Sequence, residues 1–171
     1  GLLGEITSLR IRNAHNGSIA DWLPEHFYSK EECGGGAMMD LGAHGMYLSR
    51  WFLGEPSKIT SIFNNVTDRE VEDNAISVIE FENNAIAVNE TGFVSTNDPF
   101  TLEVNGTKGS VVIGGPEGGV KLNSTENDCE ISGWVSPAQL PDPLPHPLEQ
   151  WVYGILEDEE IHFGLEEGIQ L

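Results

Sequence analysis

Hydrophobic and polar residues alternate along much of the chain, which is the pattern of half-buried β-strands. The first alternating stretch, residues 4–13, predicts a strand. Arg10 and Arg12 then share one face of this strand, because successive side chains of a strand point to opposite sides. Further strands are predicted after the first third of the chain, at residues 57–66, 74–82, 85–94, 100–104, 111–113 and 119–122.

Two short turns indicate how these strands pair. Asn83 and Asn84 join two strands as a tight hairpin, since Asn tolerates positive φ. The stretch Asn105-Gly-Thr-Lys-Gly109 predicts a second turn. Strands joined by such short turns are antiparallel.

The spacing of apolar residues becomes helical over residues 37–53. Gly34-Gly35-Gly36 precedes this helix, and Gly54 supplies a stop signal after it. Gly42 and Gly45 lie inside the helix, where each costs about 1 kcal/mol relative to Ala. We therefore expect close packing or the approach of a substrate at these two glycines.

The remaining stretches predict little regular structure. Residues 15–30 have no clear period and are expected to form a loop, and the prolines of residues 137–147 exclude regular structure there. A short helix is predicted at residues 146–156. The predicted fold class is α+β, with an open, predominantly antiparallel β-sheet of about six strands packed against helices.

The composition restricts the partners of the chain. Its 171 residues make one domain, and 8 Lys and Arg against 28 Asp and Glu give a formal charge of −20. This charge argues against nucleic acid and against an anionic membrane surface, and no apolar run approaches the roughly 18–20 residues of a membrane span. With only Cys33 and Cys129 and no signal peptide, we expect a cytoplasmic protein.

Asp40 and His44 form the candidate chemical site. They stand at positions i and i+4, one turn apart on the predicted helix, and Asp40 lies near the start, where the helix dipole stabilises a carboxylate. A carboxylate beside an imidazole makes a plausible proton-transfer site near neutral pH. A surface pair or an interior hydrogen bond is the alternative explanation of this spacing.

Other kinds of site are less favoured by the sequence. Two candidate ligands are too few for a metal, and no H-E-x-x-H is present, so no metal site is predicted. The triple glycine at residues 34–36 resembles a phosphate loop only superficially, because no strand leads into it and no Lys follows it.

The stretch from Gly34 to Gly54 resembles the signature helix of the glucose–fructose oxidoreductase/inositol dehydrogenase (Gfo/Idh/MocA) family. That signature reads G-G-G-x-x-x-D-x-G-x-H, followed by an apolar stretch and L-G-x-P, which Leu53-Gly54-Glu55-Pro56 supplies here. The start of the chain, the strands around Asn83-Asn84 and the stretch from Leu102 to Gly109 resemble the same family. The resemblance therefore covers nearly the whole chain.

The resemblance implies an NAD(P)-dependent oxidoreductase of sugars, polyols or related carbinols. Asp40 and His44 match the family residues that contact the substrate, with the His as general acid/base for the reacting hydroxyl. Arg12, His15 and Trp22 lie in the segment that often lines the substrate pocket, and we expect them to bind substrate.

The resemblance also implies that residues 1–171 are a single substrate-binding and oligomerisation domain, without the N-terminal Rossmann domain and the final C-terminal helix. NAD or NADP would bind mainly to that missing domain, which would also carry the Lys of the family's E-K-P motif, so the fragment alone is expected to be inactive. We expect a homo-oligomer through the open sheet face. The alternative is a non-catalytic sugar-sensing or oligomerisation domain of the same fold.

Overall fold

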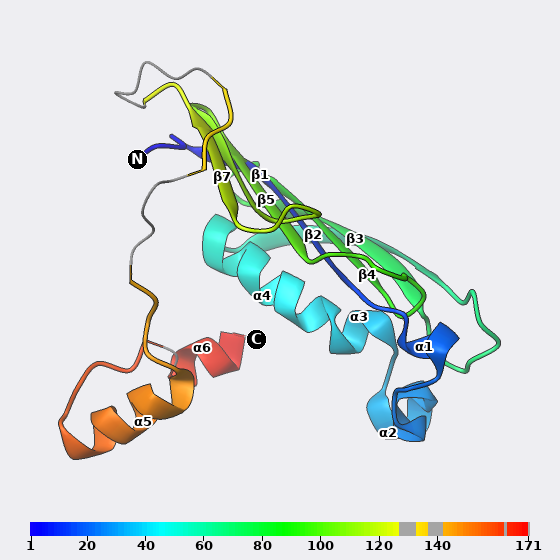
Figure 1. Cartoon of the computed structure of the whole chain (residues 1–171). Coiled ribbons are helices and arrows are strands. Elements are labelled where there is room, and N and C mark those ends of the chain that lie inside the picture. The colour runs from blue at the N-terminus through cyan, green and yellow to red at the C-terminus, as the bar shows by residue number, and fades with distance from the viewer. Residues whose placement is uncertain (127–132, 137–141, 163, 171) are drawn as a thin grey trace. The chain divides into compact units, whose positions relative to one another are not determined.

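A computed structural model describes residues 1–126, 133–136, 142–162 and 164–170 (Figure 1). Cys129 and part of the proline-rich stretch lie outside these residues. The chain divides into two compact units, residues 1–137 and residues 138–171, which are described separately below.

The first unit is built on a seven-stranded sheet in the order β2-β3-β4-β1-β5-β6-β7. Every neighbouring pair is antiparallel except β1 and β4, which run parallel. The expected open, predominantly antiparallel sheet is thus confirmed, and each strand lies close to its predicted range. The strands are β1 (Ile6–Ala14), β2 (Pro56–Asn64), β3 (Asn74–Phe81), β4 (Ile86–Gly92), β5 (Thr101–Gly106), β6 (Gly109–Gly114) and β7 (Val120–Ser124).

The predicted hairpin at Asn83-Asn84 joins β3 to β4, and Asn84 adopts a φ of 65°. The parallel pair of β1 and β4 was not predicted. It arises because the first strand inserts between β4 and β5, so that two strands far apart in the sequence become neighbours in the sheet.

The predicted helix over residues 37–53 is two helices, α3 (Ala37–Asp40) and α4 (Gly42–Leu53), separated at Leu41. Leu41 keeps right-handed helical angles, with φ −79° and ψ −31°, so the chain continues in the same helical sense. Figure 1 shows α4 lying along one face of the sheet.

The predicted loop at residues 15–30 is wrong in part, because it contains short helical turns. These are α1 (Gly17–Ala20), the 3-10 helix η1 (Glu25–Tyr28) and the start of α2 (Lys30–Cys33). Single turns of four residues are too short to show a period in the sequence. Local contacts hold them instead: the Tyr28 hydroxyl donates to the Gly17 carbonyl, 2.9 Å away.

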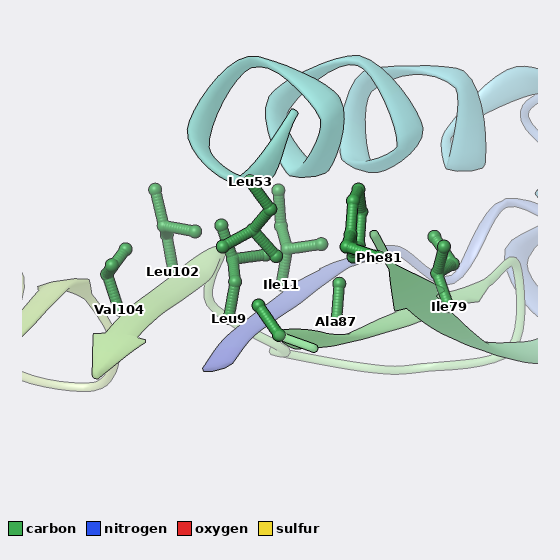
Figure 2. Close-up of a cluster of buried hydrophobic side chains, with 9 residues drawn as sticks. Leu9, Ile11, Leu53, Ile79, Phe81, Ala87, Leu102 and Val104 are labelled. Atoms are coloured by element: carbon green, nitrogen blue, oxygen red, sulfur yellow. The ribbon is translucent and has the colours of Figure 1, made fainter. Parts of the chain in front are cut away.

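The core lies between α4 and the sheet. Leu9 and Ile11 of β1 point toward the helix and are fully or almost fully buried, as is Leu53 at the end of α4 (Figure 2). The other face of β1 carries Arg10 and Arg12, as the alternation predicts. One face of the sheet is therefore apolar and covered by α4. The other face carries polar and apolar side chains, and no helix among the described residues of the first unit covers it.

Gly45 is the point of closest approach between α4 and the sheet. A Cβ atom at this position would lie 2.3 Å from Oδ1 of Asn89, a fully buried residue of β4. The Asn89 amide in turn donates to the Gly42 carbonyl, 2.9 Å away. Close packing therefore accounts for the glycine at position 45.

The second unit contains α5 (Pro147–Leu156) and α6 (Leu165–Gln170). The helix predicted at residues 146–156 is confirmed. It begins with a capping box, in which His146 Nδ1 accepts from the Leu148 amide at 3.3 Å while Glu149 accepts from the His146 amide at 3.1 Å. Among the described residues, none of the helices is long and apolar enough to cross a membrane.

Candidate functional site

Glu72 fixes the start of the helix that carries Asp40. Its two carboxylate oxygens each accept a hydrogen bond of 3.0 Å from a backbone amide, that of Gly36 and that of Met38. Its carbonyl accepts a third from Ala37, at 2.9 Å. These bonds satisfy amides that the first turn of a helix leaves without partners. The Glu72 carboxylate thus takes up the amides on which a phosphate loop would depend.

The close contact with Glu72 also explains a glycine of the signature. A Cβ atom at Gly36 would lie 1.9 Å from the backbone oxygen of Glu72, a distance at which the two atoms would overlap. The segment before β3 therefore packs directly against the N-terminus of α3.

Asp40 ends α3 and is partly buried, whereas His44 lies in the first turn of α4 and is exposed. Because Leu41 keeps helical angles, the two residues stay on neighbouring turns of one helical path. In the described part of the chain, no ion pair within 4.0 Å joins Asp40 to His44. The imidazole of His44 is thus open to solvent or to a ligand.

His15 is held between two aromatic rings. Its imidazole stacks on Phe93, with centroids 4.9 Å apart and planes 3° from parallel, and meets Trp22 at 4.7 Å with the rings tilted by 53°. Its backbone continues the contact between β1 and β4, donating to Gly92 at 2.9 Å and accepting from Ser95 at 3.0 Å. The ring therefore has a fixed place at the end of β1.

The protonation of His15 follows from its surroundings. Its Nδ1 accepts a hydrogen bond of 3.0 Å from the Gly17 amide, so that a neutral ring carries its proton on Nε2. Burial lowers the pKa of His15, while the negative charge of Asp40 acts to raise it. Two residues singled out from the sequence, His15 and Asp40, are thus brought within electrostatic reach of each other.

A cavity of about 390 Å³ opens beside His15. Trp22 stands near it with 54% of its surface exposed, and its indole N–H donates to Asn16 Oδ1 at 3.0 Å. An exposed aromatic face anchored at its polar end suits a ligand that has both apolar and polar surfaces. The cavity is lined by Ala14, His15, Asn16, Ser95, Asn97, Asp98 and Pro99.

Arg12 lies on the other face of β1, away from the His15 ring. Its guanidinium pairs with the Asp98 carboxylate at 2.7 Å and approaches Glu90 at 4.0 Å. Together with Arg10 it lines a separate cavity of about 280 Å³ on the open face of the sheet. The structure thus brings His15, Trp22 and Asp40 to one region and leaves Arg12 on the opposite face.

The sequence patterns do not single out Phe93, Asp98 or Glu72 as site residues. Phe93 falls at the end of the strand predicted at residues 85–94, whereas Asp98 and Glu72 lie in connections between strands without a periodic pattern. Each of the three acts on a residue far away in the sequence. Within the described residues, no cluster of three or more His, Cys, Asp or Glu side chains is arranged to hold a metal ion.

Residues 1–112 match the family model described as the GFO/IDH/MocA C-terminal domain. The chain belongs to the Gfo/Idh/MocA family. The matched range covers β1, the helix with Asp40 and His44, and the strands through most of β6. No curated protein sequence matches the chain.

Solved structures with the fold of this Gfo/Idh/MocA domain include several oxidoreductases. An NAD-binding oxidoreductase from Klebsiella pneumoniae superimposes with a TM-score of 0.81 at 21% identity, over 99% of this chain and 55% of its own. GenD2 from gentamicin A biosynthesis, in complex with NAD, gives 0.72 at 24% identity, over 99% and 51%.

Levoglucosan dehydrogenase in complex with NADH gives a TM-score of 0.71 at 21% identity, over 80% of this chain and 40% of its own. The chain therefore spans about half the length, or less, of these solved relatives. At these identities the likeness establishes the shared fold.

Proposed function

We propose that this chain is the substrate-binding and proton-transfer domain of an NAD(P)-dependent oxidoreductase acting on a sugar, a polyol or a related carbinol. The observation that carries the proposal is the Gfo/Idh/MocA signature helix, with Asp40 within electrostatic reach of His15 and an accessible His44 one turn further on. The family match supports the reaction class. Levoglucosan dehydrogenase, whose solved complexes contain levoglucosan and L-sorbose, supports a sugar as the substrate.

The described residues do not themselves fit a dinucleotide. Glu72 already takes up the amides at the N-terminus of α3, and strands β2 to β7 follow one another without the intervening helices of a nucleotide-binding fold. We therefore assign NAD or NADP to another part of the protein, where its nicotinamide would supply the hydride acceptor or donor.

His44 handles the proton of the reacting hydroxyl. In the oxidation direction the substrate loses a hydride from its carbinol carbon and a proton from its hydroxyl, and His44 accepts that proton. Asp40 orients the substrate hydroxyl or the imidazole. The exposure of His44 leaves its ring nitrogens accessible to the substrate.

His15 and Trp22 bind the substrate. A neutral His15 with its proton on Nε2 acts as a hydrogen-bond donor to a hydroxyl or carbonyl oxygen, and the hydrogen bond from Gly17 maintains this tautomer. The exposed face of Trp22 packs against the carbon-bound hydrogens of the ligand. This combination of a fixed donor and an aromatic face suits a neutral polyhydroxylated molecule.

Replacement of His44 by Ala in the complete protein tests the catalytic role. We expect kcat to fall by about 10²–10⁴, because a positioned general acid/base contributes an acceleration of this size. Sugars and polyols are screened with NAD and with NADP, and His26→Ala, which removes another exposed imidazole of the same unit, serves as the control. An unchanged kcat in His44→Ala would contradict the role, and sugar binding without turnover would favour a non-catalytic sensor.

We also infer that the protein forms a homo-oligomer through the open face of the sheet. Ile62, Val78 and Ile86 lie on this face, away from α4, with 60%, 39% and 46% of their surfaces exposed. Three aliphatic side chains on adjacent strands favour burial against a second copy.

A further inference from the structure

The connection between β4 and β5 forms one wall of the cavity beside His15. Ser95, Asn97 and Asp98 all line that cavity. Asn97 has a φ of 58°, a left-handed conformation that turns the chain just before Asp98. The shape of the cavity therefore depends on how this connection is held.

The first part of the connection is fixed by backbone hydrogen bonds. Phe93 donates to the Asp73 carbonyl at 2.8 Å, and Ser95 donates to the His15 carbonyl at 3.0 Å. For residues 96–98, the polar side-chain contacts found among the described residues reduce to one, an ion pair in which Arg12 Nη2 lies 2.7 Å from Asp98 Oδ2 without the geometry of a hydrogen bond. The far end of the wall thus depends on a single side-chain pair.

This pair is well suited to hold the segment. The Asp98 side chain is only 12% exposed, and a carboxylate removed from water requires a charged partner. The Arg12 side chain is 47% exposed and reaches Asp98 from the open face of the sheet. The ion pair therefore joins the face opposite α4 to the connection that borders the His15 ring.

We propose that Arg12 is a positioning residue, which holds the Asp98 wall of the His15 cavity from the opposite face of the sheet. This inference rests on the proposed function for the part that concerns sugar binding. It replaces the expectation that Arg12 contacts the substrate directly, because its guanidinium is paired with Asp98 and lies away from the His15 ring.

Arg10 provides a matched control on the same strand and face. It pairs with Glu90 at 2.8 Å and is 51% exposed, close to the 47% of Arg12. Glu90, however, belongs to β4 and is held by the strand ladder in addition to the ion pair. Loss of the Arg10 pair should therefore leave the connection after β4 unchanged.

The first test measures amide hydrogen exchange in the complete protein. Arg12→Gln and Asp98→Asn should speed exchange of the Ser95 amide, which donates to the His15 carbonyl, by about tenfold, because opening of this segment no longer breaks an ion pair. Arg10→Gln should leave this exchange unchanged. Arg12→Lys should retain slow exchange. Exchange of the Ser95 amide that is the same in Arg12→Gln as in the wild type would overturn the proposal.

The second test uses turnover of the sugar identified by the screen. Arg12→Gln should raise KM by about tenfold with kcat within about threefold of wild type, since the cavity wall is displaced while His44 is not. The charge exchange Arg12→Asp with Asp98→Arg should recover most of the loss. A fall in kcat at unchanged KM, or no recovery by the charge exchange, would overturn the role of Arg12.

The two tests separate this inference from the proposed function. If no sugar is turned over by the wild type, the proposed oxidoreductase activity fails, while the exchange measurement still decides whether Arg12 holds the connection. If Arg12→Gln does not fold, the exchange rates of Arg12→Lys, which keeps the ion pair, and Asp98→Asn, which removes it, are compared instead. Exchange of the Ser95 amide in Asp98→Asn that is as slow as in the wild type would then overturn the proposal.

Discussion

The imidazole of His15 lies flat against the ring of Phe93, with ring centroids 4.9 Å apart and planes within 3° of parallel. Phe93 is itself fully buried, so it gives the imidazole a rigid apolar support. The contact brings the end of β1 against the first residue after β4. An apolar support on one side and Trp22 on the other remove water from the ring, which favours its neutral form.

The lowered pKa of His15 predicts a loss of stability on acidification. Burial is the main cause of the shift, so the folded protein binds this proton less readily than the unfolded chain, in which His has a pKa of about 6.5. Between the two pKa values the unfolded state holds more protons, and the free energy of unfolding therefore falls as the pH drops below about 6.5.

The measurement is urea unfolding of the wild type and of His15→Gln across this pH range. Gln does not titrate, so the advantage of the wild type in free energy of unfolding should shrink as the pH falls. The carboxylates are the same in both proteins, and their contribution cancels in this difference. Parallel stability curves for the two proteins would show that the folded state does not lower the pKa of His15.

The contact between Gly45 and Asn89 predicts that Gly45→Ala is destabilising. The added Cβ would lie 2.3 Å from the Asn89 amide oxygen, and the fully buried Asn89 has little room to move. We expect a loss of about 1–3 kcal/mol, typical of overpacking in a core, in spite of the better helix propensity of Ala. Urea or thermal unfolding of the purified variant measures it.

Gly42→Ala is the control for this substitution. A Cβ at position 42 would meet the Met38 sulfur at 2.3 Å, but that atom belongs to a flexible side chain that can move aside. Its stability should therefore stay within about 1 kcal/mol of the wild type, because the helix propensity gained offsets the adjustment. Equal losses in Gly42→Ala and Gly45→Ala would contradict the special role of the Asn89 contact.

Substitution on edge strand β2 tests self-association through the open sheet face. Ile62 lies on that face and Ile59 on the opposite one, with similar exposures of 60% and 54%. Ile62→Lys should shift the protein toward the monomer in sedimentation experiments, because a buried interface would then have to accept a charge. Ile59→Lys should leave the oligomeric state as in the wild type. A wild type that is monomeric at high concentration would contradict the interface altogether.

Local patterns in the sequence predicted most of the elements. The period of two set the strands near their observed ranges, since each strand buries one face, and the period of 3.6 found the helical region with Asp40 and His44. The signature residues from Gly34 to Gly54 also indicated the family, because the motif lies within one continuous stretch. The break at Leu41 and the single turns in residues 15–30 were missed, since single turns leave no period to detect.

The amino-acid sequence by itself determined the strand-forming segments, the signature helix and the family of this protein, because these are encoded by residues close together along the chain. Tertiary structure alone decided that β1 inserts parallel to β4, that Asp40 comes within electrostatic reach of His15, and that Arg12 reaches Asp98 rather than the His15 ring. Each of these relationships joins segments that are distant in the sequence, and it exists only once the sheet has set the order and register of its strands.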